Sequence, residues 1–425
     1  MNAPFWGTTA RPSGLLDFGR PGHRPASRSL RPRSGPLGVA HERNGLHVEA
    51  LGFEDMDADQ GAWADLVARA LEPNAFFEPA FALSAARHFP VRARPHFVAV
   101  REGGAHHGPR RLMGLFPVMT PGPLPGEGLA KIWLHKQATL ATPLLDRDRA
   151  VEATTAFLGW LANATSAAGV LFPRLPKDGP AFAALAAAAR GSGLRLEIVE
   201  EHERAILYAG GDVDELWTRG ASKKELKELR RRQRRLEDMG PVEYALYESP
   251  EDVRRAAEDF IALEASGWKG GKGAFLSHPS LTTFVRSATR LLAHEGKCQI
   301  HALTLSGRPI AMGIVVESRG RAAFWKIAYD EGLRSQAPGI QLLYALTKAQ
   351  LARLDVVSTD SCAIANHPMI DRFWPDRLAI CDVAIQARAD REEAFLDHCR
   401  RERARRRLRA LAKQAAARLF KLRVS

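Results

Sequence analysis

The stretch FWKIAYDEGLRSQAPGIQLL, residues 324–343, contains the signals that decide the fold. Its aromatic and β-branched residues as far as Tyr329 predict a buried strand. A polar loop follows, and Pro338-Gly339 then opens an apolar-periodic run, residues 340–351, that predicts a helix. The first N–H groups of such a helix lack internal partners and carry partial positive charge, so this joint is suited to an anion. An ordinary strand–turn–helix joint is the alternative interpretation.

The composition bounds the class of protein. At 425 residues the chain is long enough for two domains with full cores. No apolar run approaches the roughly 20 residues of a membrane span, and the Arg- and Pro-rich N-terminus lacks the apolar segment of a secretory signal. The cysteines lie far apart and form no CxxC motif, which is typical of reduced core residues and not of a disulfide frame or zinc site. They are Cys298, Cys362, Cys381 and Cys399. We therefore expect a cytoplasmic protein without a bound metal.

The net charge of +13 is concentrated at the two ends of the chain. Residues 1–44 contribute +5, and their Pro, Gly, Arg and Ser content predicts disorder. Residues 400–425 contribute +10, which leaves −2 for residues 45–399. The basic ends are therefore evidence about binding partners and cellular location, and not about the chemistry of residues 45–399.

The two halves of the chain show the same alternation of helical and strand-like patterns. In the first half, helices are predicted at 61–71, 79–88, 149–168 and 180–190, and strands at 96–101, 111–119, 131–138, 170–172, 194–199 and 205–208. In the second half, helices are predicted at 222–239, 251–264, 279–294, 338–351 and 367–373, and strands at 242–247, 297–305, 309–317, 321–329, 356–359 and 378–385. Ser306-Gly307 and Arg319-Gly320 are tight-turn signals, so the three strands that they connect are expected to form an antiparallel meander. The second half reads β-α-α-β-β-β-α-β-α-β, and the first half can be written in nearly the same order, which predicts a topological repeat.

This order is that of the GNAT acetyltransferases. The pattern Gln336-x-x-Gly339-x-Gln341 resembles their (Arg/Gln)-x-x-Gly-x-(Gly/Ala) pyrophosphate loop, with Gln341 where Gly or Ala is usual. A tandem pair of such domains, with the phosphate loop only in the second, resembles the CelD/BcsL-type acetyltransferases and their FemAB-like relatives over residues 45–390. The stretches that carry the resemblance are SKKELKELRRRQRRLEDMG (222–240), LEASGWKGGKG (263–273), FWKIAYDE (324–331), APG (337–339) and DSCAIANHPMIDRFWPDR (360–377).

The resemblance implies an α/β fold with a mixed sheet and tandem GNAT-like (acyl-CoA N-acyltransferase) domains. The expected organisation is a disordered basic segment at 1–44, a GNAT-like domain without a phosphate loop at 45–210, a GNAT acetyltransferase domain at 211–390 and a basic amphipathic helix at 391–425. The implied co-substrate is acetyl-CoA or another acyl-CoA. The expected cofactor-binding residues are Ile327, Ala328 and Tyr329 of the strand, and Gln336, Ala337, Pro338, Gly339, Ile340 and Gln341 of the loop.

Acyl transfer needs a base that takes the proton from the nucleophile, and donors for the developing oxyanion. Asp360, just past the fifth strand, and Glu264, at the end of the first helix of the second domain, are candidates that would face the cleft. His367 and Asp371 are four residues apart, which predicts one face of a short helix on which the carboxylate orients the imidazole. A helix cap at Asp360 and a surface turn at His367 are the alternatives.

Three further residues are candidates for contact with the acceptor. Trp268 and Lys269 belong to a Gly-rich loop that borders the acceptor pocket in a GNAT fold, although a solvent loop with Trp268 in the core is equally consistent. Lys326 stands in an otherwise apolar strand. It is either a site residue or a residue whose side chain points into solvent. The run Gly267-x-x-x-Gly271-Lys272 is one residue short of a Walker A loop and lacks its Ser or Thr, so no ATP site is expected.

Two basic helices indicate possible anionic partners. Residues 222–239 carry eight Lys and Arg, offset by Glu225, Glu228, Glu237 and Asp238. This mixture favours an ordinary solvated helix, and a surface for tRNA or anionic lipid is the alternative. Residues 400–423 place leucines at heptad-like spacing among arginines, a pattern suited to the inner face of an anionic membrane or to nucleic acid. The alternatives are that this helix simply docks on the rest of the protein or that the segment is disordered.

The leading prediction is a cytoplasmic acyl-CoA-dependent N- or O-acyltransferase. Its acceptor would be a small molecule or a saccharide that attacks the thioester directly, and the resemblance suggests exopolysaccharide or cell-envelope synthesis as the setting. One alternative keeps the fold but takes the acyl group from aminoacyl-tRNA. The other is a non-catalytic scaffold, peripheral at the inner membrane face through its basic tail.

Overall fold

The fold is that of a computed structural model, which describes residues 41–43, 45–90, 94–102, 111–119, 128–267 and 274–424. The predicted disordered segment 1–44 lies outside these residues except for β1 (His41–Arg43). Those three residues were expected to be disordered, but their backbone pairs antiparallel with β2, from His41 opposite Val48 to Arg43 opposite Leu46.

The first half of the chain runs from β2 to β8. Its elements are β2 (Leu46–Leu51), α1 (Phe53–Ala58), α2 (Gln60–Arg69), η1 (Ala75–Phe77), α3 (Pro79–His88), β3 (His96–Glu102), β4 (Leu112–Met119), β5 (Leu129–Ile132), β6 (Leu144–Leu145), α4 (Ala150–Ala164), β7 (Gly169–Pro176), α5 (Pro180–Gly191) and β8 (Leu196–Tyr208).

The second half runs from α6 to α12. Its elements are α6 (Val213–Gly220), α7 (Lys223–Glu237), β9 (Val242–Tyr247), α8 (Pro250–Ser266), η4 (Phe275–Ser277), α9 (Pro279–His294), β10 (Cys298–Leu305), β11 (Arg308–Ser318), β12 (Arg321–Tyr329), η5 (Glu331–Gln336), α10 (Pro338–Leu351), β13 (Ser358–Asp360), α11 (Ile370–Phe373), β14 (Asp376–Gln386), η6 (Ala389–Arg391) and α12 (Glu392–Val424).

All these strands form one mixed sheet in which the two halves exchange their last strands. The order is β1-β2-β3-β4-β5-β7-β14-β8-β13-β12-β11-β10-β9, with β6 attached to β4. Strand β14 of the second half thus lies between β7 and β8 of the first, and β8 lies between β13 and β14. Each half repeats the same order of helices and strands, so the predicted mixed α/β fold with a topological repeat is confirmed.

Strand β12 leaves its parallel neighbour β13 after only three residue pairs, the last of which is Ala323 opposite Asp360. From Phe324 to Tyr329, β12 pairs with β11 alone, so its other edge has no strand partner in the described part of the chain. Trp325 is the extra residue of a β-bulge opposite β11, and a bulge bends its strand and re-aims its side chains. The sheet is therefore split next to the end of β12.

Several element bounds agree with the sequence because a local signal fixes them. Pro279 and Pro338 occupy the first helical positions of α9 and α10, where their missing N–H costs nothing. Ser222 caps α7 by accepting the Glu225 N–H, and Glu225 returns a bond to the Ser222 N–H. The turns at Ser306 and Arg319 have positive φ angles, and the expected meander of β10, β11 and β12 is present.

Other bounds differ from the prediction. The two strands expected at 194–199 and 205–208 are one thirteen-residue strand, β8. Its polar centre is held by ion pairs, of which Lys177–Glu201 at 2.8 Å is one. Strand β5 ends at Ile132 instead of continuing to 138, β7 extends to Pro176, and the helices α1 and α6 lack a predicted counterpart.

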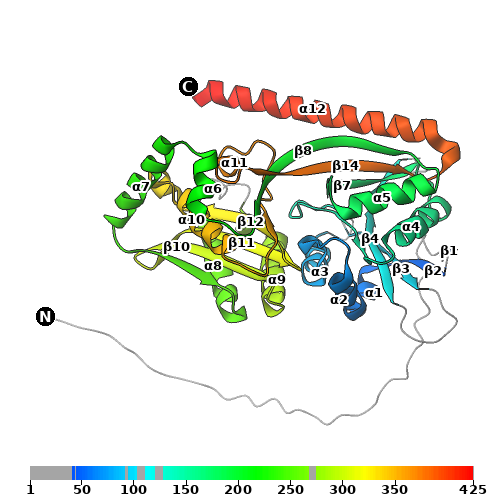
Figure 1. Cartoon of the computed structure of the whole chain (residues 1–425), viewed down its shortest axis with the longest axis horizontal. Coiled ribbons are helices and arrows are strands. Elements are labelled where there is room, and N and C mark those ends of the chain that lie inside the picture. The colour runs from blue at the N-terminus through cyan, green and yellow to red at the C-terminus, as the bar shows by residue number, and fades with distance from the viewer. Residues whose placement is uncertain are drawn as a thin grey trace, which may run out of the picture. The chain divides into compact units, whose positions relative to one another are not determined.

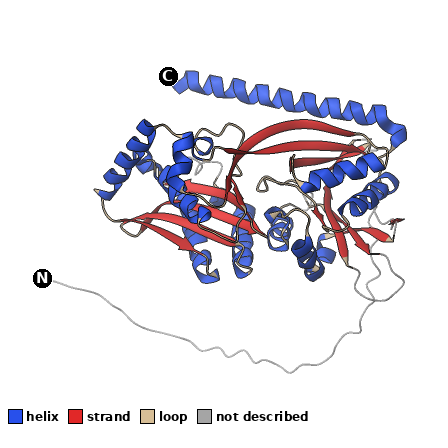
Figure 2. Cartoon of the chain, viewed as in Figure 1, coloured by secondary structure: helices blue, strands red, loops and turns tan. Residues whose placement is uncertain are grey.

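Helices cover both faces of the sheet (Figure 2). In the second half, α6, α10 and α11 enclose a cluster around the buried indoles of Trp217 and Trp374. On the other face, α8 and α9 pack against the sheet, and α9 also packs against α3 of the first half. There the Phe81 ring meets the Phe284 and Trp325 rings edge-on, with centroids 5.2 and 5.3 Å apart. This apolar contact joins the halves on one face, as the strand exchange does within the sheet.

Helix α12 runs along β8 and β14, and its first part is built into the fold (Figure 1). Phe395 and Cys399 are fully buried against β7 and β14. A Cβ at Gly169 would lie 2.8 Å from Cδ2 of Phe395, so only glycine fits below that ring. Arg403 pairs with Glu197 at 2.7 Å, and Arg406 with Asp382 at 2.6 Å. None of the helices in the described part of the chain has the length and apolar character that a membrane span requires.

Replacement of Phe395 by alanine tests whether α12 belongs to the folded body. We expect a loss of about 3–5 kcal/mol in the free energy of unfolding, because a fully buried ring is removed and a cavity is left. Denaturant titration followed by circular dichroism measures the change. Leu408→Ala on the exposed part of the same helix is the matched control, with an expected change within about 0.5 kcal/mol. Equal midpoints for the two variants would contradict the packing described above.

Candidate functional site

The predicted phosphate loop lies where η5 meets α10. Ala337 adopts a left-handed conformation with φ +53°, which turns the chain sharply into the helix at Pro338. A Cβ on Gly339 would lie 3.3 Å from Cδ1 of Tyr329, so the glycine allows α10 to begin directly against β12. The strand, the turn and the helix start therefore form one compact unit, as the sequence predicts.

The loop presents few free amides. The N–H groups of Ile340 and Gln341 both donate to the Ala337 carbonyl, at 3.0 and 3.2 Å, and Pro338 has no N–H. The Gly339 N–H is the one amide of this helix start without an acceptor among the described residues. The Gln341 side chain donates to the Gln336 carbonyl at 2.8 Å and so braces the loop. Most of the positive potential here must therefore come from the helix dipole and from nearby cations.

A basic helix lies beside this loop. Leu236 of α7 and Leu333 of η5 pack in the same small apolar cluster, with Leu342 of α10. The cations of α7 and η5 that are exposed and have no ion-pair partner among the described residues are Lys223, Lys224, Lys227, Arg230, Arg234, Arg235 and Arg334. By contrast, Arg231 and Arg232 both pair with Glu228, at 2.8 and 3.0 Å. The loop thus lies next to a cationic face suited to a polyanionic ligand.

A buried ion pair joins the two halves next to the split in the sheet. The Arg204 guanidinium on β8 binds the Asp360 carboxylate at the end of β13, and both side chains are at most 9% exposed. Arg204 also donates to the Thr139 carbonyl at 3.2 Å, and Asp360 accepts the Cys362 N–H at 2.9 Å. Asp360 was expected just past the strand, but it is the last residue of β13, because this ion pair and the pairing with β8 extend the strand by one residue.

Cys362 stands beside this pair but has no property of a nucleophile. Its Sγ accepts a hydrogen bond from the Thr139 hydroxyl at 3.2 Å. Burial, followed by the nearby Asp360 charge, raises the pKa of the Cys362 thiol to about 12. The thiol is therefore protonated at neutral pH, whereas nucleophilic cysteines have a lowered pKa.

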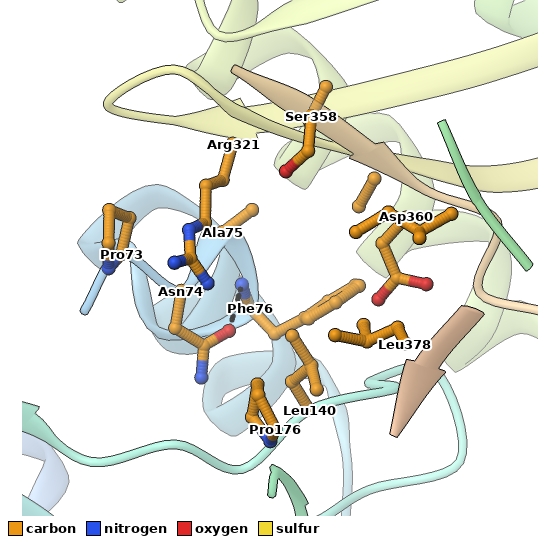
Figure 3. A pocket seen from close by; sticks show the side chains of 13 residues that line it. Pro73, Asn74, Ala75, Phe76, Leu140, Pro176, Arg321, Ser358, Asp360 and Leu378 are labelled. Atoms are coloured by element: carbon orange, nitrogen blue, oxygen red, sulfur yellow. Dashed lines mark hydrogen bonds between the residues drawn. The ribbon is translucent and has the colours of Figure 1, made fainter. Parts of the chain in front are cut away.

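A small cavity borders the same ion pair (Figure 3). It has a volume of about 40 Å³, enough to hold a water molecule. The Asp360 carboxylate points toward it, with Ser358 of the same strand, Arg321 of β12 and Leu378 of β14 also in its lining (Figure 3). Asn74 and Phe76 of the first half close the other side. Asp360 therefore borders a small, mostly apolar space with room for one water molecule, although its two oxygens already accept hydrogen bonds.

The expected helical pairing of His367 with Asp371 is wrong. Helix α11 begins only at Ile370, so His367 precedes it. The His367 Nδ1 accepts the N–H groups of Met369 and Ile370 at 3.4 Å and closes the turn that leads into the helix. Pro368 explains the difference, because the residue before a proline is driven out of the helical conformation.

The other predicted site residues have different surroundings. The Glu264 carboxylate is 6% exposed and accepts the Phe275 N–H at 2.9 Å, which fixes η4 to the end of α8. The Lys326 ammonium lies 5.7 Å from the Phe275 ring centroid and 5.4 Å from that of Trp325, so it faces aromatic side chains instead of bulk solvent. Trp268 and Lys269 lie outside the described residues.

A large cleft of about 1270 Å³ opens between the two halves. Its walls come from the segment after β5, from β7, β8 and β14, from the start of α9, from residues 362–365 and from α12. His135 lines it, and two residues further along the same segment the Gln137 carbonyl accepts the Trp325 indole N–H of β12 at 2.7 Å. The segment after β5 thus lies between the cleft and the part of β12 that leads to the phosphate loop.

Sequence reasoning missed His135, which lies in an aromatic wall of the cleft. Its ring stacks at 5.8 Å on Phe81 and lies 4.7 Å from Trp133 between ring centroids. Nδ1 accepts the Gln137 N–H at 3.3 Å, while Nε2 is buried and has no partner among the described residues. Desolvation, followed by the Lys326 charge, lowers the pKa of His135 to about 3. The imidazole is therefore neutral at pH 7, and the Nδ1 contact assigns its proton to Nε2. The only signal in the sequence was a histidine between Trp133-Leu134 and Lys136.

His135 makes stability depend on pH. Its pKa is lower in the folded state than the usual 6.5, so the unfolded chain binds a proton that the folded chain does not. Stability is therefore complete above pH 6.5 and falls as the pH decreases toward 3, at a slope approaching about 1.4 kcal/mol per pH unit. We expect the free energy of unfolding of His135→Phe to fall less steeply with decreasing pH, by up to about 1.4 kcal/mol per pH unit, when denaturant unfolding is measured between pH 7.5 and 4.5. A constant difference between the variant and the natural protein across this range would contradict the assignment.

The comparison with family models assigns part of the chain. Residues 223–359 match a family described as "Acetyltransferase (GNAT) domain", which covers about a third of the sequence, from α7 into β13. No curated protein matches the chain.

Solved structures with similar folds share little sequence with the chain. FemX is 9% identical with a TM-score of 0.48, and the match covers 79% of this chain and 96% of FemX. The C-terminal domain of a putative lysylphosphatidylglycerol synthetase from Agrobacterium fabrum is 14% identical with a TM-score of 0.44, covering 80% and 96%. A tandem GNAT protein from the clavulanic acid biosynthesis pathway is 15% identical with a TM-score of 0.39, covering 81% and 99%. At these values the similarities support no conclusion about substrates. The family match assigns residues 223–359 to the GNAT acetyltransferases, and the enzyme class it supports is an acyltransferase.

Proposed function

We propose that the protein transfers an acyl group from acetyl-CoA or another acyl-CoA to an amine or hydroxyl acceptor. The donor binds along the open edge of β12 and at the start of α10, and the acceptor enters from the cleft shared by the two halves. The observation that carries the proposal is the split between β12 and β13 next to a helix start, within the residues that match the GNAT domain.

The donor site offers two kinds of contact. From Phe324 to Tyr329 the free edge of β12 has backbone groups for the amide-containing pantetheine arm, which in GNAT proteins lies along this strand. At its end, the Gly339 N–H, the dipole of α10 and the exposed Arg334 of η5 would bind the pyrophosphate. The unpaired cations of α7 extend this positive region toward the remaining phosphate of CoA.

The proposed reaction is a direct attack of the acceptor on the thioester. The acceptor lone pair forms the new bond to the carbonyl carbon, the carbon–sulfur bond breaks, and CoA leaves as the thiol after the acceptor gives up its proton. The raised pKa of Cys362 supports this route, because a protonated thiol is a poor candidate for a covalent acyl-enzyme.

Three groups were predicted as bases: Asp360, His367 and Glu264. Of these we favour Asp360, which borders a cavity that can hold water and whose oxygens have lone pairs left over from their bonds to Arg204 and Cys362. The His367 Nδ1 is occupied by two backbone N–H groups, and Glu264 anchors η4, so both are better suited to holding loops.

The finer assignment follows the resemblance in the sequence. We propose a CelD/BcsL-type enzyme, with a GNAT-like domain at 45–210, the acetyltransferase domain at 211–390, and a saccharide or other small acceptor of exopolysaccharide or cell-envelope synthesis. We further propose a cytoplasmic location, where the basic residues of 400–425 can meet the inner membrane face.

Titration of the full chain with acetyl-CoA by calorimetry tests the donor site. We expect saturable binding that Arg334→Glu weakens about tenfold or more, because the substitution reverses a charge beside the pyrophosphate. Arg190→Glu on the exposed surface of α5 is the matched control and should leave the affinity unchanged. No binding by the folded natural protein would refute the acyl-CoA proposal.

A second candidate function uses the same fold with an aminoacyl-tRNA as the donor. The specific observation in its favour is the row of unpaired cations on α7 beside the loop, since a single CoA has fewer phosphates than this face can contact. Because most N–H groups of the loop already donate to backbone carbonyls, recognition through side-chain charge is also favoured.

Gel-shift titration with charged tRNA distinguishes the two donors. If tRNA is the donor, neutralising Lys227, Arg230 and Arg234 together should lower the affinity and reduce the slope of log K against log salt by up to about three. Acetyl-CoA should then give no heat on titration. Under the acyl-CoA proposal, tRNA binding is weak, acetyl-CoA gives heat on titration, and the same triple variant weakens acetyl-CoA binding because it removes positive charge near the CoA phosphates. Arg190→Gln serves as the control for added surface neutralisation.

A further inference from the structure

The large cleft has an apolar end and a charged end. Phe89, Trp133, His135 and Leu281 line it where the segment after β5 faces the start of α9. The charged end is formed by β7, β8, β14 and the face of α12 that runs along the sheet (Figure 1). A volume of about 1270 Å³ exceeds the 300–1,000 Å³ common for small-molecule sites. The cleft therefore has room for an acceptor with two chemically different parts.

The acidic residues of the charged end are already matched by cations. Glu402 pairs with Lys131 at 3.5 Å and with Arg406 at 3.0 Å. Asp382 pairs with Arg406 at 2.6 Å, and the same guanidinium binds Glu200. These pairs attach α12 to the sheet and neutralise one another, so they leave no negative charge to repel an anion.

Three cations of the lining form no ion pair within 4.0 Å among the described residues: Lys136, Arg174 and Arg409. They come from the segment after β5, from β7 and from α12, and so surround the cleft from three sides. In the described part of the chain, the Arg174 guanidinium donates one hydrogen bond, to the Ala138 carbonyl at 3.4 Å. The nearest acids, Asp382 and Glu200, are already paired with Arg406. An unmatched set of this kind favours a negatively charged ligand.

The backbone of β7 is distorted at Arg174. Phe172 pairs with Val383 and Leu175 with Cys381, so Pro173 and Arg174 together oppose the single residue Asp382. In this bulge Arg174 has φ +52°, a left-handed conformation that costs energy for a residue with a Cβ. The Arg174 N–H donates to the Asp382 Oδ1 at 2.8 Å and holds the distortion. Bulges often change the direction of a side chain, and Arg174, which is part of this bulge, lines the cleft.

The apolar end offers one polar contact. The Nε2–H of His135 is buried, has no partner among the described residues and belongs to a residue that lines the cleft. A buried donor without a partner costs free energy, which an acceptor atom on a bound ligand would recover. The rings of Phe89 and Trp133 beside it supply flat apolar surface.

We propose that this cleft selects an acyl acceptor that joins an anionic group, a phosphate or carboxylate, to an apolar part. Arg174, Arg409 and Lys136 bind the anion, and the aromatic wall binds the apolar part, with His135 donating to a polar atom of that part. The inference rests on the proposed function only in naming the ligand an acyl acceptor. The anion site itself is inferred from the lining residues and does not depend on acyl transfer.

A pair of dyes tests the site directly. 1-Anilinonaphthalene-8-sulfonate has an aromatic part and a sulfonate, and N-phenyl-1-naphthylamine has the same rings without the charge. We expect the sulfonate dye to bind the full chain at one site, and Arg174→Gln to weaken it about tenfold while the neutral dye changes by less than twofold. An unchanged affinity for the sulfonate dye, or an equal loss for both dyes, would overturn the proposal.

Matched variants on α12 keep the test independent of folding. Arg409→Gln replaces an exposed lining residue and should also weaken the sulfonate dye. Arg407→Gln, about 200° away on the same helix and outside the lining, should not. Thermal melting confirms that each variant is folded. If Arg174→Gln fails to fold, the comparison of Arg409→Gln with Arg407→Gln decides, and equal affinities in those two variants overturn the proposal.

Competition identifies the source of the anion and separates this proposal from the donor site. Dihexanoyl phosphatidic acid and glucose 1-phosphate are added to the dye complex. Displacement by the lipid alone indicates a lipid phosphate, displacement by the sugar phosphate indicates a soluble one, and displacement by neither at millimolar concentration overturns the proposed ligand class. Acetyl-CoA that binds without displacing the dye supports separate sites. Acetyl-CoA that displaces it would assign the cleft to the donor and overturn the acceptor assignment. Failure of acetyl-CoA to bind at all would refute the donor proposal and leave the dye results valid.

Discussion

The buried pair between Arg204 and Asp360 is the constraint on which the rest of the structure depends. A guanidinium that is 1% exposed is strongly destabilising without its carboxylate, because an uncompensated buried charge costs several kcal/mol. Arg204 lies on the exchanged strand of the first half and Asp360 on the short strand beside the split, so this pair fixes the register of one half on the other. Through Thr139 and Cys362 it also positions the two loops that approach the cleft. The pair therefore serves both the continuity of the sheet and the shape of the site.

Strand β12 connects the phosphate loop to the aromatic wall of the cleft, because Trp325 packs against Phe81, which stacks on His135. Strand β12 has the phosphate loop at its end and the Lys326 ammonium within electrostatic reach of His135 in the cleft wall. A thioester laid along β12 would thus be approached from the side of the cleft. Because only the Gly339 N–H of this helix start lacks an acceptor in the described part of the chain, the proposed donor would rely more on side-chain charge than on free amides, and its binding should be sensitive to salt.

Much of the fold could be predicted because the signals are local. Pro279 and Pro338 mark helix starts, and the turns at Ser306 and Arg319 define the meander, so these bounds need no knowledge of the rest of the chain. The continuous strand β8 could not be predicted, since its polar centre is stabilised by residues more than 150 positions away, among them Asp360 and Arg406. The same holds for the site. Gly339 has a local signature, whereas the role of His135 arises only when Phe81, Trp133 and Lys326 surround it. Trp268 and Lys269 stay predictions.

The exchange of β8 and β14 has a consequence for synthesis of the protein on the ribosome. When β8 emerges, both of its neighbours in the finished sheet, β13 and β14, are still missing. About 170 residues separate the end of β8 from the start of β14, which at roughly 5–20 residues per second amounts to on the order of 10–30 s of translation. During that interval β7 and β8 present unpaired edges, the kind of surface that promotes aggregation. The nascent first half is therefore a natural client for chaperones, and it cannot complete its sheet before the second half arrives.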